Sequence, residues 1–288
     1  MIKHSKIKFF QFKNILYKSI LILCVKLSAQ EIPNEFFTFK KNYIEIDAGI
    51  NWEKNSTFGP VRFQDIRNHN VEKDSSTINA RYGLSTKNKN ISYYGYGKLN
   101  FKKNFYCFIY SRLVDDVDAF PRFSGLSQRR SRFGFKAGET DMSGFGYDDG
   151  KLLFQISRGR QDWGAGNNIN LALSSSSPPY DYLLGGINLG LLRLRYFNGF
   201  LESDSLGINR FISSRGFEIN NFKNFIFSVS ELVIYSGMNR PMDFSYFNPI
   251  SSHLEIELNN RQNIHGTEDG NAVWQISFDS YIKNKFRF

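Results

Sequence analysis

Cysteine, histidine and long apolar runs are all scarce in this chain. Its 288 residues include two cysteines and four histidines. Cys24 lies in a segment that we expect to be removed, which leaves Cys107 alone and rules out an internal disulfide. The histidine and cysteine spacings fit no zinc site, so we expect neither a metal nor a cofactor. No segment approaches the roughly 20 apolar residues of a transmembrane helix, so any membrane-spanning part has to consist of strands.

Motifs for nucleotide binding and for nucleophilic catalysis are also missing. Residues 164–166 lack the third glycine of a dinucleotide-binding turn, and no βαβ pattern surrounds them. An outer-membrane hydrolase would need His253, which follows two serines, or a carboxylate pair such as Asp148 and Asp149. A hydrogen-bonding histidine and solvated loop carboxylates are the simpler interpretations, and we predict that the protein is not an enzyme.

Acidic residues are absent from the first 29 residues, which carry six of the lysines. The Lys-rich start, the apolar run 19–25 and the small residues before Gln30 form the pattern of a secretory signal peptide. We therefore expect a leader at 1–29 and one mature domain at 30–288. Cleavage removes six charges from the formal net charge of +10, so the basic excess does not indicate a nucleic-acid partner.

Aromatic residues, by contrast, are abundant. Phe contributes 29 residues and Tyr 15, whereas the mean hydropathy is −0.39. A transmembrane β-barrel has this composition, because lipid-facing and lumen-facing residues alternate between aromatic girdles. A large soluble β-sandwich shares it, so the order of the residues has to decide.

Segments of about ten alternating residues that end in turn-forming residues predict strands. The predicted strands are 43–52, 77–86, 91–101, 105–114, 131–138, 151–158, 184–197, 211–219, 225–236 and 272–281. Tight turns are predicted at 87–90, 102–104 and 222–224, longer loops at 115–129, 199–210 and 237–249, and one short helix at 250–258. Short turns at one rim and long loops at the other predict an all-β fold, an antiparallel transmembrane β-barrel of the outer-membrane type with small helical elements.

One predicted hairpin can be read in register. A three-residue loop at 222–224 places Arg215 opposite Glu231. Opposite charges on facing residues stabilise a ladder by roughly 0.2–1 kcal/mol, whereas an arginine facing lipid near the midplane costs about 2–4 kcal/mol. We therefore predict that this pair lies in the barrel lumen.

The stretch GRQDWGAGNNINLALSSSSPPYDYLLGG, residues 159–186, combines flat rings with hydrogen-bonding groups, as sugar-binding sites do. Hydrogen bonds to charged groups contribute about 1.5–3 kcal/mol each. The residues predicted to contact carbohydrate, here and in other loop-type segments, are Arg160, Asp162, Trp163, Asn167, Asn168, Tyr180, Arg210 and Arg240. The alternative is a girdle tryptophan among loop polar residues.

From about residue 133 to 278 the chain resembles the capsule-assembly Wzi-like outer-membrane proteins of Gram-negative bacteria. The resemblance is carried by the 159–185 stretch, LRLRYFNGFLES, NRFISSRGFEI, FSVSELVIYSGMNRPMDFSYFNPISSHLEIELNNRQN and GNAVWQISFD. It implies an outer-membrane barrel with a non-catalytic, lectin-like role that binds capsular polysaccharide and helps to attach it to the cell surface. Ala165 stands where better-known members have proline. A porin-like channel is the alternative function.

The end of the sequence bears on barrel closure. Residues 272–281 form a complete predicted strand, and 286–288 form the start of another. A barrel with an unpaired lipid-facing edge would leave backbone groups unsatisfied in the membrane. We therefore expect the barrel domain to be incomplete at its C-terminus.

Overall fold

The computed structural model describes residues 56–59, 76–101, 104–120, 123, 131, 133–164, 170, 172–174, 176–203, 205–253, 270–282 and 286–287. The predicted leader 1–29 and the predicted strand 43–52 lie outside these residues.

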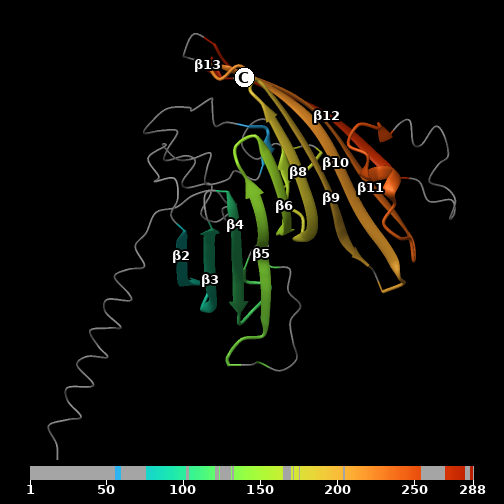
Figure 1. Cartoon of the computed structure of the whole chain (residues 1–288). Helices are drawn as coiled ribbons and strands as arrows, with labels where there is room; N and C mark the ends of the chain where they lie inside the picture. Colours follow the sequence, from blue (N-terminus) through green and yellow to red (C-terminus); the bar gives the residue numbers. More distant parts are fainter. Residues whose placement is uncertain are drawn as a thin grey trace, which may run out of the picture.

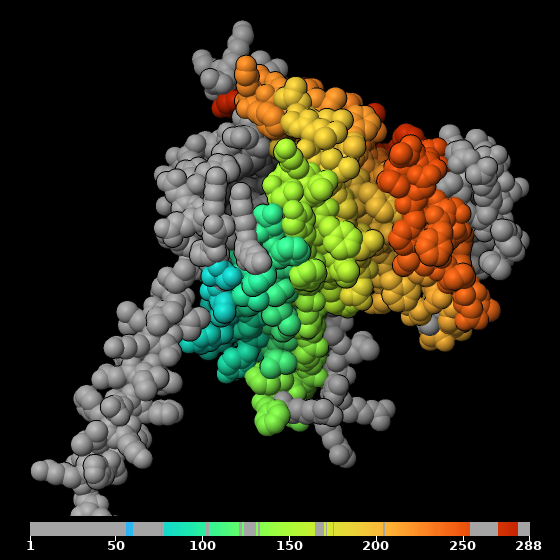
Figure 2. Space-filling model, in the orientation of Figure 1, coloured from blue at the N-terminus to red at the C-terminus, as the bar shows by residue number. Residues whose placement is uncertain are grey.

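Eleven antiparallel strands form one twisted sheet, in which strands that follow one another in the main sheet also lie side by side (Figure 1). They are β2 (Thr77–Lys87), β3 (Asn90–Phe101), β4 (Phe105–Val114), β5 (Ala137–Asp148), β6 (Leu152–Gly159), β8 (Tyr180–Leu189), β9 (Leu192–Ser203), β10 (Ile208–Asn220), β11 (Phe225–Met238), β12 (Asn271–Ile282) and β13 (Phe286–Arg287). The order of colours across the space-filling surface follows the same sequence (Figure 2). The prediction of an all-β, antiparallel fold is confirmed.

Two short strands stand apart from this sheet. β1 (Phe58–Gly59) pairs with β7 (Asp162–Trp163) in a separate two-stranded ribbon. A 3₁₀ helix, η1 (Phe244–Phe247), follows β11, with Asp243 as its N-cap. Most of the helix predicted at 250–258 lies outside the described residues. Among the residues described, β2 and β13 each pair along one side only, so the sheet seen is open rather than a closed barrel.

Most strand predictions agree with the structure, but three segments differ. The predicted strand 184–197 is a hairpin of β8 and β9, with Gly190 in the turn at a φ of 67°. Leu189 and Leu192 pair across that turn and keep the alternation unbroken, which hides it in the sequence. The strand predicted at 131–138 begins at Ala137 instead, and the loop predicted at 199–210 is reduced to 204–207.

The two faces of the sheet differ sharply in polarity. Alternation and register assign each side chain to one face. On what we call the apolar face lie exposed side chains from β2–β6, β8–β10 and β12, including Ile78, Tyr82, Tyr93, Leu99, Phe105, Ile109, Phe145, Phe154, Ile156, Ile187, Leu194, Phe217, Trp274, Ile276 and Phe278. On the opposite polar face lie buried polar side chains, including Lys98, Asn100, Arg112, Gln155, Ser157, Arg195, Ser214, Glu218, Ser228, Gln275 and Asp279.

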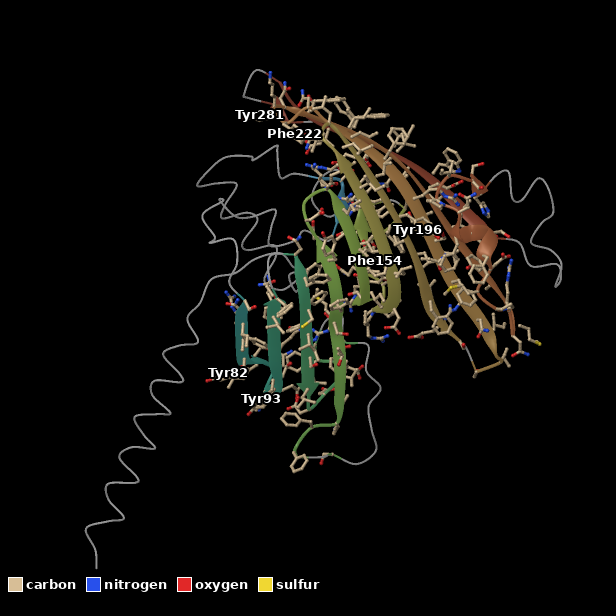
Figure 3. All side chains as sticks on the ribbon, in the orientation of Figure 1. Tyr82, Tyr93, Phe154, Tyr196, Phe222 and Tyr281 are labelled. Carbon is tan, nitrogen blue, oxygen red and sulfur yellow. The ribbon has the colours of Figure 1, made fainter. Side chains whose placement is uncertain are left out.

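The two ends of the sheet differ in the length of their connections. At the short-turn end, the connections are 102–104, 149–151, 190–191, 221–224 and 283–285. At the long-loop end, they are 88–89, 115–136, 160–179, 204–207 and 239–270. Tyr82 and Tyr93 mark the long-loop end in Figure 3, and Phe222 and Tyr281 mark the short-turn end. The tight turn predicted at 87–90 therefore belongs to the long-loop end.

Candidate functional site

Three short segments meet on the polar face and form what we call the inner ribbon: residues 56–59, 162–164 and 172–174. Phe58 pairs with Trp163, and the Gly164 backbone N–H donates to the carbonyl of Thr57 at 2.8 Å. On its other side, the Trp163 backbone N–H donates to the carbonyl of Leu173 at 3.1 Å. A segment from before the sheet and a loop from its long-loop end are thus hydrogen-bonded to each other.

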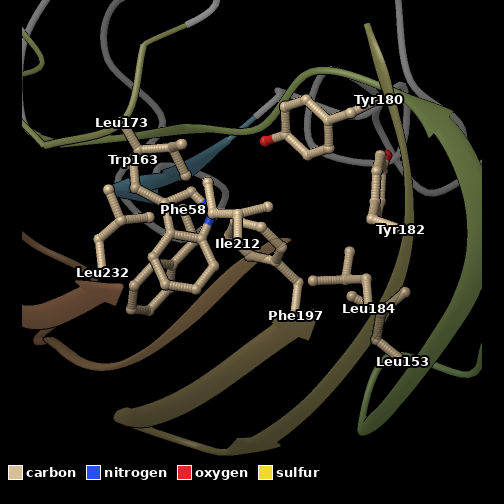
Figure 4. Close-up of a cluster of buried hydrophobic side chains, with 10 residues drawn as sticks. All are labelled: Phe58, Leu153, Trp163, Leu173, Tyr180, Tyr182, Leu184, Phe197, Ile212 and Leu232. Atoms are coloured by element: carbon tan, nitrogen blue, oxygen red, sulfur yellow. The ribbon is translucent and has the colours of Figure 1, made fainter. Parts of the chain in front are cut away.

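Trp163 is the centre of the largest buried apolar cluster (Figure 4). Its ring is 2% exposed and packs edge-on against Phe58 and Phe197, with ring centroids 4.8 and 5.3 Å apart. Its Nε1 donates to Oε1 of Gln161 at 3.3 Å. A ring enclosed in this way has no free face on which a sugar can stack, so Trp163 is a core residue and not an exposed binding platform.

Two polar side chains of the sheet hold the inner ribbon in place. The Glu218 carboxylate accepts hydrogen bonds from the Thr57 backbone N–H at 2.5 Å and from the Thr57 hydroxyl at 2.8 Å, and it pairs with Arg193 at 2.7 Å. Gln275 donates from Nε2 to the carbonyl of Trp163 at 2.8 Å and accepts from the Ala172 N–H at 2.9 Å. Both anchors are buried, so their bonds have little competition from water.

A buried charged network fixes the start of the connection after β6. Arg160 donates from Nη1 to Asp141 at 2.6 Å and from Nε to the carbonyl of Ser177 at 2.5 Å. Arg112 lies between Glu139 and Asp141, with 2.8 Å from its Nε to the Glu139 carboxylate and 3.5 Å from Nη2 to Asp141. The four ionisable side chains are at most 7% exposed. Arg160 is therefore already bonded within the protein.

The remaining predicted contact residues are divided between interior and surface. Tyr180 is buried, and its hydroxyl accepts from the Gln161 backbone N–H at 3.1 Å. Asp162 accepts from the Asn170 side chain. Arg240 is buried over the Tyr235 ring, 5.1 Å from its centroid. Asn167 and Asn168 lie outside the described residues. Of the predicted contact residues that the structure describes, only Arg210 is exposed, at the start of β10.

Arg215 and Glu231 face each other in the predicted register, with 3.0 Å between Arg215 Nε and Glu231 Oε2. Both lie on the apolar face, where Phe217 is on the same strand as Arg215 and Trp274 faces Glu231, and not among the buried polar side chains of the opposite face; a position in a lumen stays a prediction. Charges are tolerated there because the chain after β11 folds back over them. The Asn248 carbonyl accepts from Arg215 Nη1 at 2.9 Å, and the His253 backbone N–H donates to Glu231 at 3.0 Å.

His253, the candidate for a hydrolase, is 3% exposed and stacks on Tyr246 with ring centroids 5.6 Å apart. The neighbouring Ser251 hydroxyl accepts from the Asn248 amide at 2.7 Å. Within the described part of the chain, no group of three or more His, Cys, Asp or Glu side chains is placed to hold a metal ion. Nor does that part contain a helix long and apolar enough to cross a membrane.

Glu218 and Gln275 were not predicted from the sequence, although a signal for one of them exists. In the hairpin register that pairs Arg215 with Glu231, Glu218 lies opposite Ser228 on the other face of the sheet. A carboxylate that faces a serine and stands between Phe217 and Ile219 indicates an interior partner. Nothing in the local sequence identifies that partner as Thr57, which is 161 residues away.

No family model, no curated protein and no solved structure matches this chain.

Proposed function

We propose that this protein is an outer-membrane protein whose apolar face contacts lipid and whose long-loop end engages surface polysaccharide. The observation that supports it most is the distribution of polarity across the sheet. Ile276 and Phe278 are 72% and 51% exposed on the apolar face, whereas Gln155 and Glu218 are fully buried on the polar face. Exposed apolar surface is unfavourable in water by about 25 cal/mol per Å², and in a bilayer the same surface faces hydrocarbon.

The lengths of the connections indicate how the sheet is oriented in the membrane. Outer-membrane strands are joined by short turns on the periplasmic side and by longer loops outside the cell. The long-loop end, with its connections at 115–136, 160–179 and 239–270, therefore faces outward in this proposal. The resemblance to the Wzi-like proteins supports a lectin-like role at that end, in the assembly or attachment of capsule.

The structure changes which residues are candidates for sugar contact. Glu202, Arg210 and Asn239 are exposed at the long-loop end, where Arg210 pairs with Glu202 in the ladder and Asn239 donates to the carbonyl of Gly207. We call these three residues the rim group. They offer charged and amide groups to sugar hydroxyls, whereas Arg160 and Trp163 act from the interior by holding the adjacent loop.

Two variants, one at each end of the sheet, test whether the rim group binds sugar. Arg210→Ala should weaken binding of purified bacterial capsular polysaccharide by about tenfold, because a hydrogen bond to a charged group contributes about 1.5–3 kcal/mol. Lys223→Ala, at the short-turn end, removes the same charge and should leave binding unchanged. Biolayer interferometry on the full chain in detergent measures both. Equal affinity in the two variants would remove the rim group from the proposal.

A further inference from the structure

The chain that leaves β11 turns back and lies along the apolar face, as the orange-red residues at the right of Figure 2 show. We call residues 239–253 the strap. Its contacts move steadily along the strands: Arg240 over Tyr235, Asn248 on Arg215 and His253 on Glu231. From Tyr235 to Glu231 the strap covers about 13 Å of β11, at about 3.3 Å per residue. It reaches the middle of the 14-residue strand.

The centre of the strap is anchored by one tyrosine. Tyr246 is fully buried and stacks on Tyr235 with ring centroids 4.0 Å apart and an interplanar angle of 8°. Its carbonyl accepts two hydrogen bonds from the sheet, from the Tyr196 hydroxyl at 2.9 Å and from the Ser213 hydroxyl at 3.1 Å. The strap is therefore packed against the apolar face of the sheet and is not a loose external loop.

Several backbone groups along the strap are hydrogen-bonded within the protein. The backbone N–H groups of Asn239, Arg240, Ser245, Tyr246, Ile250 and His253 all donate to protein acceptors. The carbonyls of Arg240, Tyr246 and Asn248 all accept from side chains of the sheet. Two further positions, Pro241 and Pro249, have no N–H to satisfy. Irregular backbone requires this kind of satisfaction if it is to lie at membrane depth.

Two large apolar side chains project outward from the strap, where Asn248 is also exposed. Phe244 is 82% exposed and Ile250 89% exposed, while the polar contacts of the strap point inward to Arg215 and Glu231. An external loop in water would be expected to have the opposite arrangement. The exposed side chains instead continue the apolar face of the sheet over the Arg215–Glu231 pair, whereas a second ion pair on that face, Arg158–Asp181, lies at the long-loop end and is exposed.

We propose that the strap from Phe244 to His253 lies in the hydrocarbon region of the membrane, where Phe244 and Ile250 contact lipid acyl chains and the inner side shields the Arg215–Glu231 pair from lipid. This inference rests on the proposed membrane location of the apolar face. It makes the first part of the β11–β12 connection a membrane-embedded element on the outside of the wall, although its place in the sequence is that of an external loop.

Nitroxide labels on single cysteines test this placement. The full chain, with Cys24 and Cys107 replaced by serine, is reconstituted in phosphatidylcholine vesicles and labelled at Phe244→Cys or Ile250→Cys. Collision with molecular oxygen, which concentrates in hydrocarbon, is compared with collision with a water-soluble nickel chelate. We expect both strap labels to collide at least several-fold more with oxygen than with nickel.

Two control positions distinguish a failure of the strap inference from a failure of the membrane proposal. Ile276→Cys, on the apolar face of β12, reports whether the sheet itself contacts lipid, and Lys223→Cys, in a short turn, should favour nickel. Nickel-accessible strap labels beside an oxygen-accessible Ile276 label would overturn the strap inference alone. Strap labels shielded from both reagents would also overturn it, because a protein partner would then cover them. A nickel-accessible Ile276 label would overturn the membrane proposal itself.

Discussion

At the scale of single residues, buried polar side chains rather than exposed ones define the interior of this protein. Glu218 accepts hydrogen bonds from Ser56 and Thr57 and forms an ion pair with Arg193. It therefore connects β10 to the inner ribbon and to β9. The buried ion pair between Glu218 and Arg193 is stabilising only while both charges are present, because removing one leaves the other buried without its partner.

We expect Glu218→Gln to lower the free energy of unfolding by about 3–5 kcal/mol, the usual effect of removing one partner of a buried ion pair. Urea unfolding in detergent micelles, followed by circular dichroism, measures it. Asp181→Asn is the matched control, because the Arg158–Asp181 pair is exposed (34% and 64%) and should contribute no more than about 1 kcal/mol. Similar losses in both variants would contradict the anchoring role of Glu218.

At the scale of strands and turns, glycine decides how closely neighbouring side chains pack on the polar face. Gly144 and Gly146 of β5 lie beside the rings of Phe108 and Tyr106. A Cβ on Gly146 would overlap the Tyr106 ring and stand 2.9 Å from the backbone carbonyl oxygen of Phe154. The Tyr106 ring has little freedom to move, because its hydroxyl donates to Gln155 at 2.6 Å.

Gly146→Ala should therefore destabilise the sheet by about 1–3 kcal/mol, the range found for overpacked positions. Gly185→Ala in β8 is the control, since a Cβ there meets no atom within 4 Å. Midpoints of thermal unfolding compare the two variants. If Gly146→Ala melts with or above Gly185→Ala, the close packing between β5 and Tyr106 is not a constraint.

The turn between β5 and β6 adds a dependence on pH. The backbone N–H groups of Leu152 and Lys151 donate to the Asp149 carboxylate at 2.7 and 2.9 Å, and these bonds lower the pKa of that group. A lowered pKa in the folded state stabilises the fold above the unfolded pKa of about 3.9, and this contribution is lost as the pH falls through the folded pKa. Asp149→Asn should show a smaller loss of stability between pH 6 and pH 2 than the unaltered protein. Urea titrations at pH 6 and pH 2 measure this loss, and an equal loss in Asp149→Asn and in the unaltered protein would contradict the prediction.

At the scale of the whole molecule, the inner ribbon occupies the polar face of the sheet. It is hydrogen-bonded to β10 through Glu218 and to β12 through Gln275, and Trp163 belongs to a buried cluster that includes Ile212 of β10 and Leu232 of β11. Under the proposed membrane location, the ribbon packed on the polar face argues against the porin-like alternative, because an ion would find apolar side chains rather than water beside Trp163.

We therefore expect little steady conductance when the full chain is inserted into planar lipid bilayers. Gln275→Ala, which removes two hydrogen bonds to the ribbon, should raise the frequency of channel openings without changing insertion. Large, stable conductance steps from the unaltered protein would favour the channel function. Ser228→Ala, on the same face of the neighbouring β11, controls for the loss of a buried polar side chain other than Gln275.

The sequence by itself determined the all-β class, most strand positions and the Arg215–Glu231 register. These features depend on contacts between near neighbours, which a period of two and a turn length specify. It did not distinguish the hairpin at Gly190, because the apolar alternation continues through that turn.

Only the tertiary structure decided what each candidate side chain does. Trp163 and Arg160 lie in a segment rich in loop-forming residues, yet their partners Phe58, Phe197 and Asp141 come from distant parts of the chain. Likewise, only the fold shows that the strap returns over the apolar face and bonds to both Arg215 and Glu231. Burial depends on contacts between segments that are remote in sequence. A local pattern can therefore identify a polar or aromatic residue without showing whether it is buried or exposed.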